Sequence, residues 1–290
     1  VNKVQTLDVW RRNGFIGPNQ LLVSKRAFEL SAEEAYQKIE SRLSYPFVAK
    51  PIDQNGGIAV KIIRNRTDLD AYLRMMFRPQ GADGAEYRKI LKLKPKSEFP
   101  FAEEALLESM IGPDGARHFL EISATIMASP TVEGSLKYQI FDLAEMIPGQ
   151  VHPVIPARFS KNPQEQHFLS SQIKADFEKA ARILNIFGLA TIDGFVRIYE
   201  NTNPEVILLE ANTLPPLHYG RGVMQQSGLM GVTPFALLDQ VLTESRQYAE
   251  LVPTLVAEVV TAPKVTIPIA SIPTTEPVVA PVEIAPAVVD

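Results

Sequence analysis

The chain of 290 residues is predicted to adopt an α+β fold with largely antiparallel sheets. Helix-like and strand-like segments alternate along residues 1–250, but they lack the regular strand–helix–strand rhythm of a doubly wound parallel fold. An apolar content of 46% is sufficient for a buried core. The length allows one large domain or two small ones, and no internal repeat is visible.

Four segments are predicted to be helices because a capping residue or early acids precede apolar residues at helical spacing. They are residues 31–43, residues 67–77, residues 172–187 and a last helix that begins near Thr233. Strands are predicted where β-branched and other apolar residues run together between turn residues. These strands are "PFVAKP", "IAVKII", "ALLESMI", "HFLEISATIM", "SLKYQIFDLAEMI", "DGFVRIYE" and "EVILLEAN".

Composition excludes several classes of protein. A formal net charge of −4 provides no field that would attract nucleic acid, so a small-molecule partner is favoured. No apolar run has the length of a membrane span, and the first residues are not a signal peptide. The chain has no cysteine, which excludes disulfides and thiolate metal sites and fits a cytoplasmic location.

The last forty residues differ in character from the rest. Residues 251–290 contain seven prolines and neither glycine nor aromatic residues. Because proline removes backbone donors and blocks helices, this segment is predicted to be a Pro/Val-rich extended linker or tail. Its valines and isoleucines leave open a β-like docking segment.

The run "VILLEANTLPP" (residues 206–216) predicts a cation site. Successive strand side chains point to opposite faces, so Glu210 and Asn212 share one face while Ala211 turns into the core. Asp193 becomes a third ligand if the two neighbouring strands pair as a hairpin. Magnesium prefers such oxygen ligands together with substrate phosphates. The alternative is a charged strand end without a metal.

A second candidate site follows the strand "PFVAKP". Lys50 ends this strand just before a loop that contains Gly56 and Gly57. A lysine beside a glycine loop can hold phosphate oxygens by its charge and by backbone N–H groups. The motif is weak alone, since Asn-Gly is also an ordinary hairpin turn.

Taken in order, "AKPIDQNGG", "LLESMI", "EISATIM", "TIDGF" and "LLEANTLPP" resemble the ATP-grasp superfamily, most closely the central and C-terminal domains of D-alanine:D-alanine ligase. The resemblance covers about residues 2–247. It implies two α+β lobes, roughly 1–110 and 111–250, with nucleotide between them. It also implies a carboxylate-amine ligase that uses ATP and Mg²⁺ (or Mn²⁺) and proceeds through an acylphosphate, with small carboxylate and amine substrates such as amino acids.

The resemblance assigns a role to each matching residue. Two lysines are implied to contact nucleotide phosphates, a hinge strand to hold adenine, a glutamate to bind ribose, and three oxygen ligands to bind Mg²⁺. In that order they are Lys3 and Lys50, Glu108 with the backbone of Ser109, Met110 and Ile111, Glu121, and Asp193, Glu210 and Asn212.

The chain also departs from the family pattern at catalytic positions. An arginine two residues before the first metal carboxylate is replaced by Thr191, and Arg158 or Arg221 are candidate substitutes for its charge. Losing such a cation costs on the order of 100-fold in rate. Pro216 stands where the family has a glycine whose N–H contacts substrate, and His218 and Tyr219 stand where the family has hydroxyl residues that seat the second substrate. His218 is a candidate base or substrate contact, or a packing residue.

Two segments differ in length from the family. Residues 78–99 form a basic insertion whose Lys89, Lys92, Lys94 and Lys96 are either a lid over the nucleotide or a solvated face. The family's phosphate-covering lysine is missing between Lys137 and Lys161. The family's N-terminal domain is also missing, and an upstream domain in the same polypeptide is expected to supply it. A degenerate ATP-grasp module that binds nucleotide or a partner without ligation is the alternative.

Overall fold

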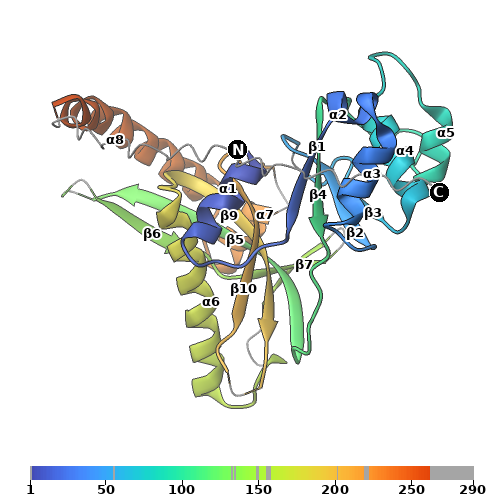
Figure 1. Cartoon of the computed structure of the whole chain (residues 1–290). Coiled ribbons are helices and arrows are strands. Elements are labelled where there is room, and N and C mark those ends of the chain that lie inside the picture. Colours follow the sequence, from blue (N-terminus) through green and yellow to red (C-terminus); the bar gives the residue numbers. More distant parts are fainter. Residues whose placement is uncertain are drawn as a thin grey trace, which may run out of the picture. The chain divides into compact units, whose positions relative to one another are not determined.

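The computed structural model describes residues 2–54, 56–131, 133, 135–147, 150–154, 158–200, 202–218 and 222–261. The chain divides into two units, residues 1–249 and residues 250–290. Figure 1 shows the first unit as two antiparallel sheets with their helices. Among the described residues, no helix is both long and apolar enough to cross a membrane.

The first sheet has four strands in the order β1-β4-β2-β3, all antiparallel. The strands are β1 (Gln20–Ser24), β2 (Phe47–Pro51), β3 (Lys61–Ile63) and β4 (Glu104–Ser109). One face of this sheet packs in an apolar core with its helices, and the side chains that alternate with the core residues point the other way. Val48, Lys50 and Glu108 belong to this second face.

The helices of the first sheet are α2 (Lys25–Leu30), α3 (Ala32–Glu40), α4 (Arg66–Met76) and α5 (Ala85–Ile90). Ser31 caps α3 by accepting a hydrogen bond from the Glu34 N–H, and Asn65 caps α4 by accepting one from the Asp68 N–H. Their buried side chains, with Leu69 and Tyr72 at zero exposure, form the core with the inner face of the sheet.

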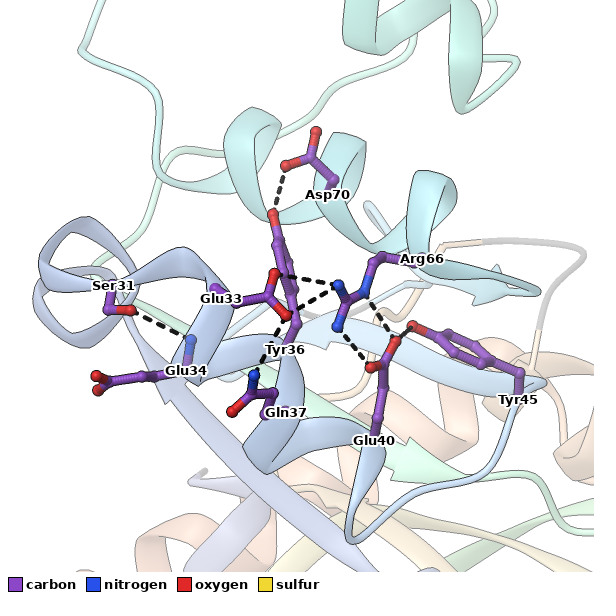
Figure 2. Close-up of polar contacts among 9 residues, drawn as sticks. All are labelled: Ser31, Glu33, Glu34, Tyr36, Gln37, Glu40, Tyr45, Arg66 and Asp70. Atoms are coloured by element: carbon purple, nitrogen blue, oxygen red, sulfur yellow. Dashed lines mark hydrogen bonds and ion pairs between the residues drawn. The ribbon is translucent and has the colours of Figure 1, made fainter.

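A polar cluster ties α3 to α4 on the surface (Figure 2). The Arg66 guanidinium lies 3.1 Å from Glu33 Oε2 and 2.7 Å from Glu40 Oε2, and its Cζ lies 4.9 Å from the centroid of the Tyr36 ring. The Tyr36 hydroxyl donates a hydrogen bond to Asp70. The cluster therefore holds the two helices together on the core side of the first sheet.

The second sheet has six antiparallel strands. The order is β10-β9-β5-β7-β8, with β6 paired to β5. The strands are β5 (His118–Pro130), β6 (Leu136–Ile140), β7 (Ala144–Ile147), β8 (Gln150–Pro153), β9 (Gly188–Ile198) and β10 (Glu205–Asn212). In Figure 1, β9 and β10 lie side by side in yellow and orange, as the predicted hairpin requires.

Two helices cover the inner face of the second sheet: α1 (Lys3–Arg12) and α6 (Pro163–Ile183). Trp10 of α1 is completely buried and donates a hydrogen bond from Nε1 to the Ala180 carbonyl, 3.0 Å away. The outer face receives α7 (Gly222–Leu229) and the start of α8 (Pro234–Thr261), whose Val223 and Leu237 are buried against Met127. The part of the outer face that α7 and α8 leave uncovered lines a pocket.

The predicted α+β class with antiparallel sheets is confirmed, whereas several boundaries differ. The strand predicted over residues 135–147 is two strands, because β6 pairs with residues 126–130 of β5 whereas β7 pairs with residues 122–123. The lobe predicted over residues 1–110 does not include α1, since Leu7 and Trp10 pack in the core of the second sheet. The tail predicted from residue 251 begins as helix, because α8 continues to Thr261; residues 262–290 lie outside the described residues.

Candidate functional site

A pocket of about 860 Å³ lies between the two sheets, lined by the outward faces of both. The structure brings together at this pocket all the residues predicted to bind nucleotide or metal. These are Lys3, Lys50, Gly56, Gly57, Glu108, Ser109, Met110, Ile111, Glu121, Asp193, Glu210 and Asn212. They come from positions as far apart in sequence as α1 and β10, so their convergence results from the fold.

An acidic row, formed by Asp193 on β9 and Glu210 on β10, lies at the pocket beside Ser123 on β5. Asp193 on β9 is the Cα partner of Ser123 on β5 and of Glu210 on β10. All three side chains therefore point to the same face. Asn212 follows on β10, opposite Thr191.

A β-bulge places Glu210 on this face. Leu208 pairs with Gly194 and points into the core, but Glu210 pairs with Asp193, so Leu209 is an extra residue in β10. In a regular strand with no bulge at Leu209, Glu210 would share the face of Leu208 and be buried in the core. The bulge turns both Leu209 and Glu210 toward the pocket.

Gly194 is needed opposite this bulge. A Cβ at Gly194 would lie 2.7 Å from the carbonyl oxygen of Ile207, which is shorter than any ordinary van der Waals contact. Since the neighbouring atom is backbone, a side chain here would force the two strands apart. The dipeptide Asp193-Gly194 therefore combines a pocket carboxylate with the glycine that allows its partner strand to bulge.

The acidic row has an electrostatic signature. Burial, together with the nearby carboxylates of Glu210 and Glu121, raises the pKa of Asp193 to about 7, although the hydrogen bond from Ser123 opposes this shift. Carboxylates that repel one another in a buried place are stabilised by a cation.

The donor set fits a hard divalent ion that shares its coordination with phosphate oxygens, since it consists of two carboxylates and one amide oxygen. The amide oxygen of Asn212 also accepts a hydrogen bond from the Leu214 N–H at 3.1 Å, which fixes its orientation. Within the described part of the chain, no group of three or more His, Asp or Glu residues is arranged to hold a metal without further ligands. Phosphate oxygens would have to complete the site.

Lys3 connects the acidic row to the loop after β2. Its Nζ lies 3.4 Å from Glu210 Oε2 and donates hydrogen bonds to the carbonyls of Gln54 at 2.5 Å and Ile52 at 3.4 Å. The residue is only 5% exposed. A buried ammonium group thus lies between the loop and the predicted metal ligand Glu210.

Lys50 is held by a buried ion pair. Its Nζ lies 2.6 Å from Glu108 Oε2, and the other oxygen of Glu108 accepts a hydrogen bond from Gln20 Nε2 at 2.7 Å. The side chains of Lys50 and Glu108 are 10% and 5% exposed. Because both carboxylate oxygens of Glu108 have partners, this side chain positions Lys50, and within the described residues the neighbouring backbone is the part of this end of the pocket with free polar groups.

The hinge between the sheets offers that backbone. Met110 and Ile111 follow the last residue of β4, and both line the pocket. No hydrogen bond among the described residues uses their backbone N–H or C=O groups. Glu121 lies across the pocket on β5 beside Phe195, and withdrawal from water raises the pKa of its carboxyl.

The residues that depart from the family pattern lie in different places. Thr191 lines the pocket and is 9% exposed. Arg158 does not line it, because its Nη1 forms an ion pair with Glu145 at 2.5 Å; Arg221 lies outside the described residues. His218 is exposed and does not line the pocket, whereas Pro216 does.

The basic insertion is not a lid in this structure. Residues 85–90 form α5, which packs on α4, and α4 covers the face of the first sheet that points away from the pocket. None of Lys89, Lys92, Lys94 and Lys96 is among the residues that line the pocket. Of the two alternatives, the solvated face is the one found.

Several pocket residues were not predicted from the sequence. They include Ser123, Met146, Phe195 and Val223. The alternation of β5 and β9 could have identified Ser123 and Phe195, since they share a face with Glu121 and Asp193. Met146 and Val223 carry no such signal, because only the tertiary fold brings β7 and α7 to the pocket.

Comparisons with known proteins identify the fold. No protein-family model matches the chain, and no curated protein matches it by sequence. Among solved structures, the D-alanine-D-alanine ligase from Coxiella burnetii superposes with a TM-score of 0.57 at 16% sequence identity, covering 89% of this chain and 61% of the ligase. The VanG D-Ala:D-Ser ligase from Enterococcus faecalis gives a TM-score of 0.55 at 13% sequence identity, covering 83% of this chain and 60% of the ligase.

A third structure, the D-alanine–D-alanine ligase from Bacillus anthracis complexed with ATP, gives a TM-score of 0.53 at 17% identity, covering 86% of this chain and 66% of the ligase. The chain thus spans about three fifths of the length of the first two ligases. At these identities the likeness shows the fold. The chain has the ATP-grasp fold of the D-alanine:D-alanine ligases, which confirms the resemblance predicted from the sequence.

Proposed function

We propose that this protein is an ATP- and magnesium-dependent carboxylate-amine ligase. The observation that carries the proposal is the convergence, in one pocket of an ATP-grasp fold, of two buried lysines, a free hinge backbone and an acidic row. One of the three similar structures is described as complexed with ATP. A reaction that consumes ATP requires a compartment that supplies it, so the cytoplasm is the expected location.

Each group in the pocket has a role in this proposal. The backbone of Met110 and Ile111 binds the adenine edge, Glu121 binds the ribose hydroxyls, and Lys3 and Lys50 bind phosphate oxygens. Asp193, Glu210 and Asn212 hold Mg²⁺, which neutralises phosphate charge when bound. The ion pair with Glu108 keeps Lys50 directed into the pocket before the nucleotide arrives.

The chemical step is the one that the ATP-grasp resemblance implies. A substrate carboxylate attacks the γ-phosphate, ADP leaves, and an amine then displaces phosphate from the acylphosphate to form an amide. Because the similar structures are D-Ala-D-Ala and D-Ala:D-Ser ligases, we propose small amino acids as substrates. Since the chain spans about three fifths of two of those ligases, part of the substrate site is expected from another segment, such as an upstream domain.

One observation favours a second function, which is nucleotide binding without ligation. Thr191 lies in the pocket two residues before Asp193, where the family has an arginine, and Arg158 is engaged with Glu145 outside the pocket. A site without this cation binds Mg-ATP but stabilises the transferring phosphoryl group poorly. The two functions differ only in turnover.

The binding step is tested by thermal unfolding of the full chain with ATP alone, with Mg²⁺ alone and with both. A ligand at about 100 times its dissociation constant adds roughly 2.7 kcal/mol of stability. We expect a rise in Tm that requires both components and that is lost in Glu210→Ala. Glu104→Ala is the matched control, because Glu104 is exposed at the start of β4 and is not among the residues that line the pocket.

Turnover is tested by release of ADP and phosphate in the presence of amino-acid pairs. Release that depends on both a carboxylate and an amine substrate supports the ligase. Binding without such release supports the second function. No shift in Tm with ATP and Mg²⁺ together would contradict both.

A further inference from the structure

Arg197 occupies a position on the pocket side of the second sheet that no role above explains. It lies on β9, with Phe119 on β5 and Glu205 on β10 as its Cα partners. Its side chain is 13% exposed. A guanidinium group that is this buried requires partners, because burying an unpaired charge is costly.

The partners of Arg197 lie in two places. Nη1 is 2.8 Å from Glu205 Oε2 and 3.4 Å from Asp114 Oδ2, while Nε donates a hydrogen bond of 2.8 Å to the carbonyl oxygen of Gly112. Glu205 neutralises the charge from within the sheet. Gly112 and Asp114 belong to the segment that connects β4 to β5. Arg197 therefore fastens this connection to the second sheet.

The fastened connection is the hinge that forms one wall of the pocket. Gly112 directly follows Ser109, Met110 and Ile111, which line the pocket. The strand before them belongs to the first sheet and the strand after them to the second. The position of the hinge relative to the acidic row on β9 and β10 thus depends on what holds it, and Arg197 is on the same strand as Asp193.

The chemistry of arginine suits this task. Its planar fork supplies one N–H to a carbonyl and another to a carboxylate at fixed mutual directions. A lysine could hold either partner but would not fix both in one geometry. Phe195, two residues before Arg197 on the same face, lines the pocket and stacks on Phe119 with ring centroids 4.9 Å apart, so an aromatic pair lies on the sheet next to the fork.

We propose that Arg197 is a positioning residue that sets the affinity and base selectivity of the pocket for adenine nucleotides, by holding the hinge backbone at a fixed place relative to the acidic row. This inference rests on the proposed function. Arg197 touches no substrate atom in it. Its effect is confined to the base end of the nucleotide, because Lys3, Lys50 and the acidic row keep their own contacts.

The test compares the full chain with Arg197→Met and Arg197→Lys by titration with Mg-ATP, Mg-GTP and Mg-tripolyphosphate. Arg197→Met is expected to weaken Mg-ATP binding by about tenfold, the equivalent of about 1.4 kcal/mol, and to reduce the preference for ATP over GTP by a similar factor. Binding of Mg-tripolyphosphate, which has no base, is expected to stay unchanged. The Mg-ATP affinity of Arg197→Lys should lie between that of the wild type and that of Arg197→Met.

The matched control is Arg182→Met. Arg182 is also an arginine in an ion pair, 2.7 Å from Glu178 on α6, and it does not line the pocket. We expect wild-type affinity for all three ligands. If Arg197→Met weakens the binding of Mg-ATP and of Mg-tripolyphosphate equally, or weakens the binding of neither ligand, Arg197 has only a general structural role and the inference is wrong.

A second measurement does not require nucleotide. Hydrogen exchange of the amides of residues 110–116 should be faster in Arg197→Met than in the wild type, and unchanged in Arg182→Met. Equal exchange in all three proteins would overturn the inference. If the wild type binds neither Mg-ATP nor Mg-tripolyphosphate, the proposed function is wrong, and so is this role of Arg197. If the wild type binds both ligands and Arg197→Met binds Mg-ATP equally well, only the inference about Arg197 is wrong.

Discussion

Glu210 and Asp193 face the same pocket from directly paired positions on β10 and β9, and the bulge at Leu209 is the cause. In a regular strand Glu210 would point to the same side as Leu208, which is completely buried. Strand β10 is thus irregular at the position where Glu210 lies beside Asp193. Bulges commonly redirect a side chain next to a functional site.

The bulge predicts that Gly194 cannot be replaced. Gly194→Ala places a Cβ 2.7 Å from the Ile207 carbonyl, so the strands must separate at the bulge. We expect a loss of about 1–3 kcal/mol in the free energy of unfolding, as for other overpacked positions, and a Tm lower by about 2–4 °C for each kcal/mol. Thermal and urea unfolding of the purified variant measure both.

Gly228 in α7 provides the matched control for this substitution. A Cβ at Gly228 meets no atom within 4 Å, and alanine is the better helix former. Gly228→Ala should therefore leave the Tm unchanged or raise it. A Gly194→Ala protein as stable as the wild type would show that the strands can separate at no cost.

A second prediction concerns the buried pair of Lys50 and Glu108. Glu108→Gln keeps the shape of the side chain but removes the carboxylate with which the buried Lys50 ammonium is paired. Breaking a buried pair in this way costs about 3–5 kcal/mol. Urea unfolding without nucleotide should show this loss.

The double variant Lys50→Met/Glu108→Gln separates charge from packing. Because it leaves no unpaired charge, it should be less destabilised than Glu108→Gln alone. If the double variant loses as much stability as Glu108→Gln and Lys50→Met lose together when made singly, the two groups do not interact in the folded protein.

The sequence predicts the pocket residues better than the fold around them. Local rules predict Lys50, Asp193, Glu210 and Asn212 as pocket residues, because a strand places alternate residues on one face and a glycine loop beside a lysine favours a phosphate site. The bulge at Leu209 does not follow, since "VILLEAN" alternates no differently from a regular buried strand until its partner is known. That Glu210 and Asn212 share a face is the part that local alternation settles.

Elements fixed by tertiary contacts were the ones that sequence reasoning missed. Helix α1 contains only four buried residues, and its Trp10 finds its partner, the Ala180 carbonyl, 170 positions away. The basic insertion was ambiguous because lysines do not reveal which face of a sheet they lie on. Its place was decided by α4, to which α5 is packed.

A third prediction concerns Arg158, a candidate for the missing catalytic cation. Since Arg158 is paired with Glu145 outside the pocket, Arg158→Met should leave Mg-ATP affinity and any rate of ADP release within about twofold of the wild type. Titration and a steady-state assay measure both quantities. A rate loss on the order of 100-fold would identify Arg158 as the substitute cation.

The last prediction is a pH dependence of stability caused by His118. Burial, with the positive charges of Arg117 and Arg158, lowers the pKa of this imidazole, and its Nε2 is buried without a hydrogen-bond partner among the described residues. The unfolded chain therefore binds a proton near pH 6.5 that the folded protein does not. The contribution of His118 to the free energy of unfolding should therefore fall as the pH is lowered through about 6.5, while Asp193, whose pKa is raised to about 7, contributes in the opposite direction.

The His118 ring contacts Phe159 edge-on, with ring centroids 5.2 Å apart. His118→Phe isolates the contribution of the proton, because phenylalanine can keep this contact and binds no proton. Urea unfolding between about pH 5 and 7.5 should show that the variant becomes more stable relative to the wild type as the pH is lowered, since it lacks the destabilising protonation of His118. The exposed His167 on α6 is the control, and His167→Gln should keep the dependence of the wild type. If His118→Phe follows the wild-type curve at every pH, the imidazole is protonated in the folded protein as readily as in the unfolded chain, and its burial has no effect on acid stability.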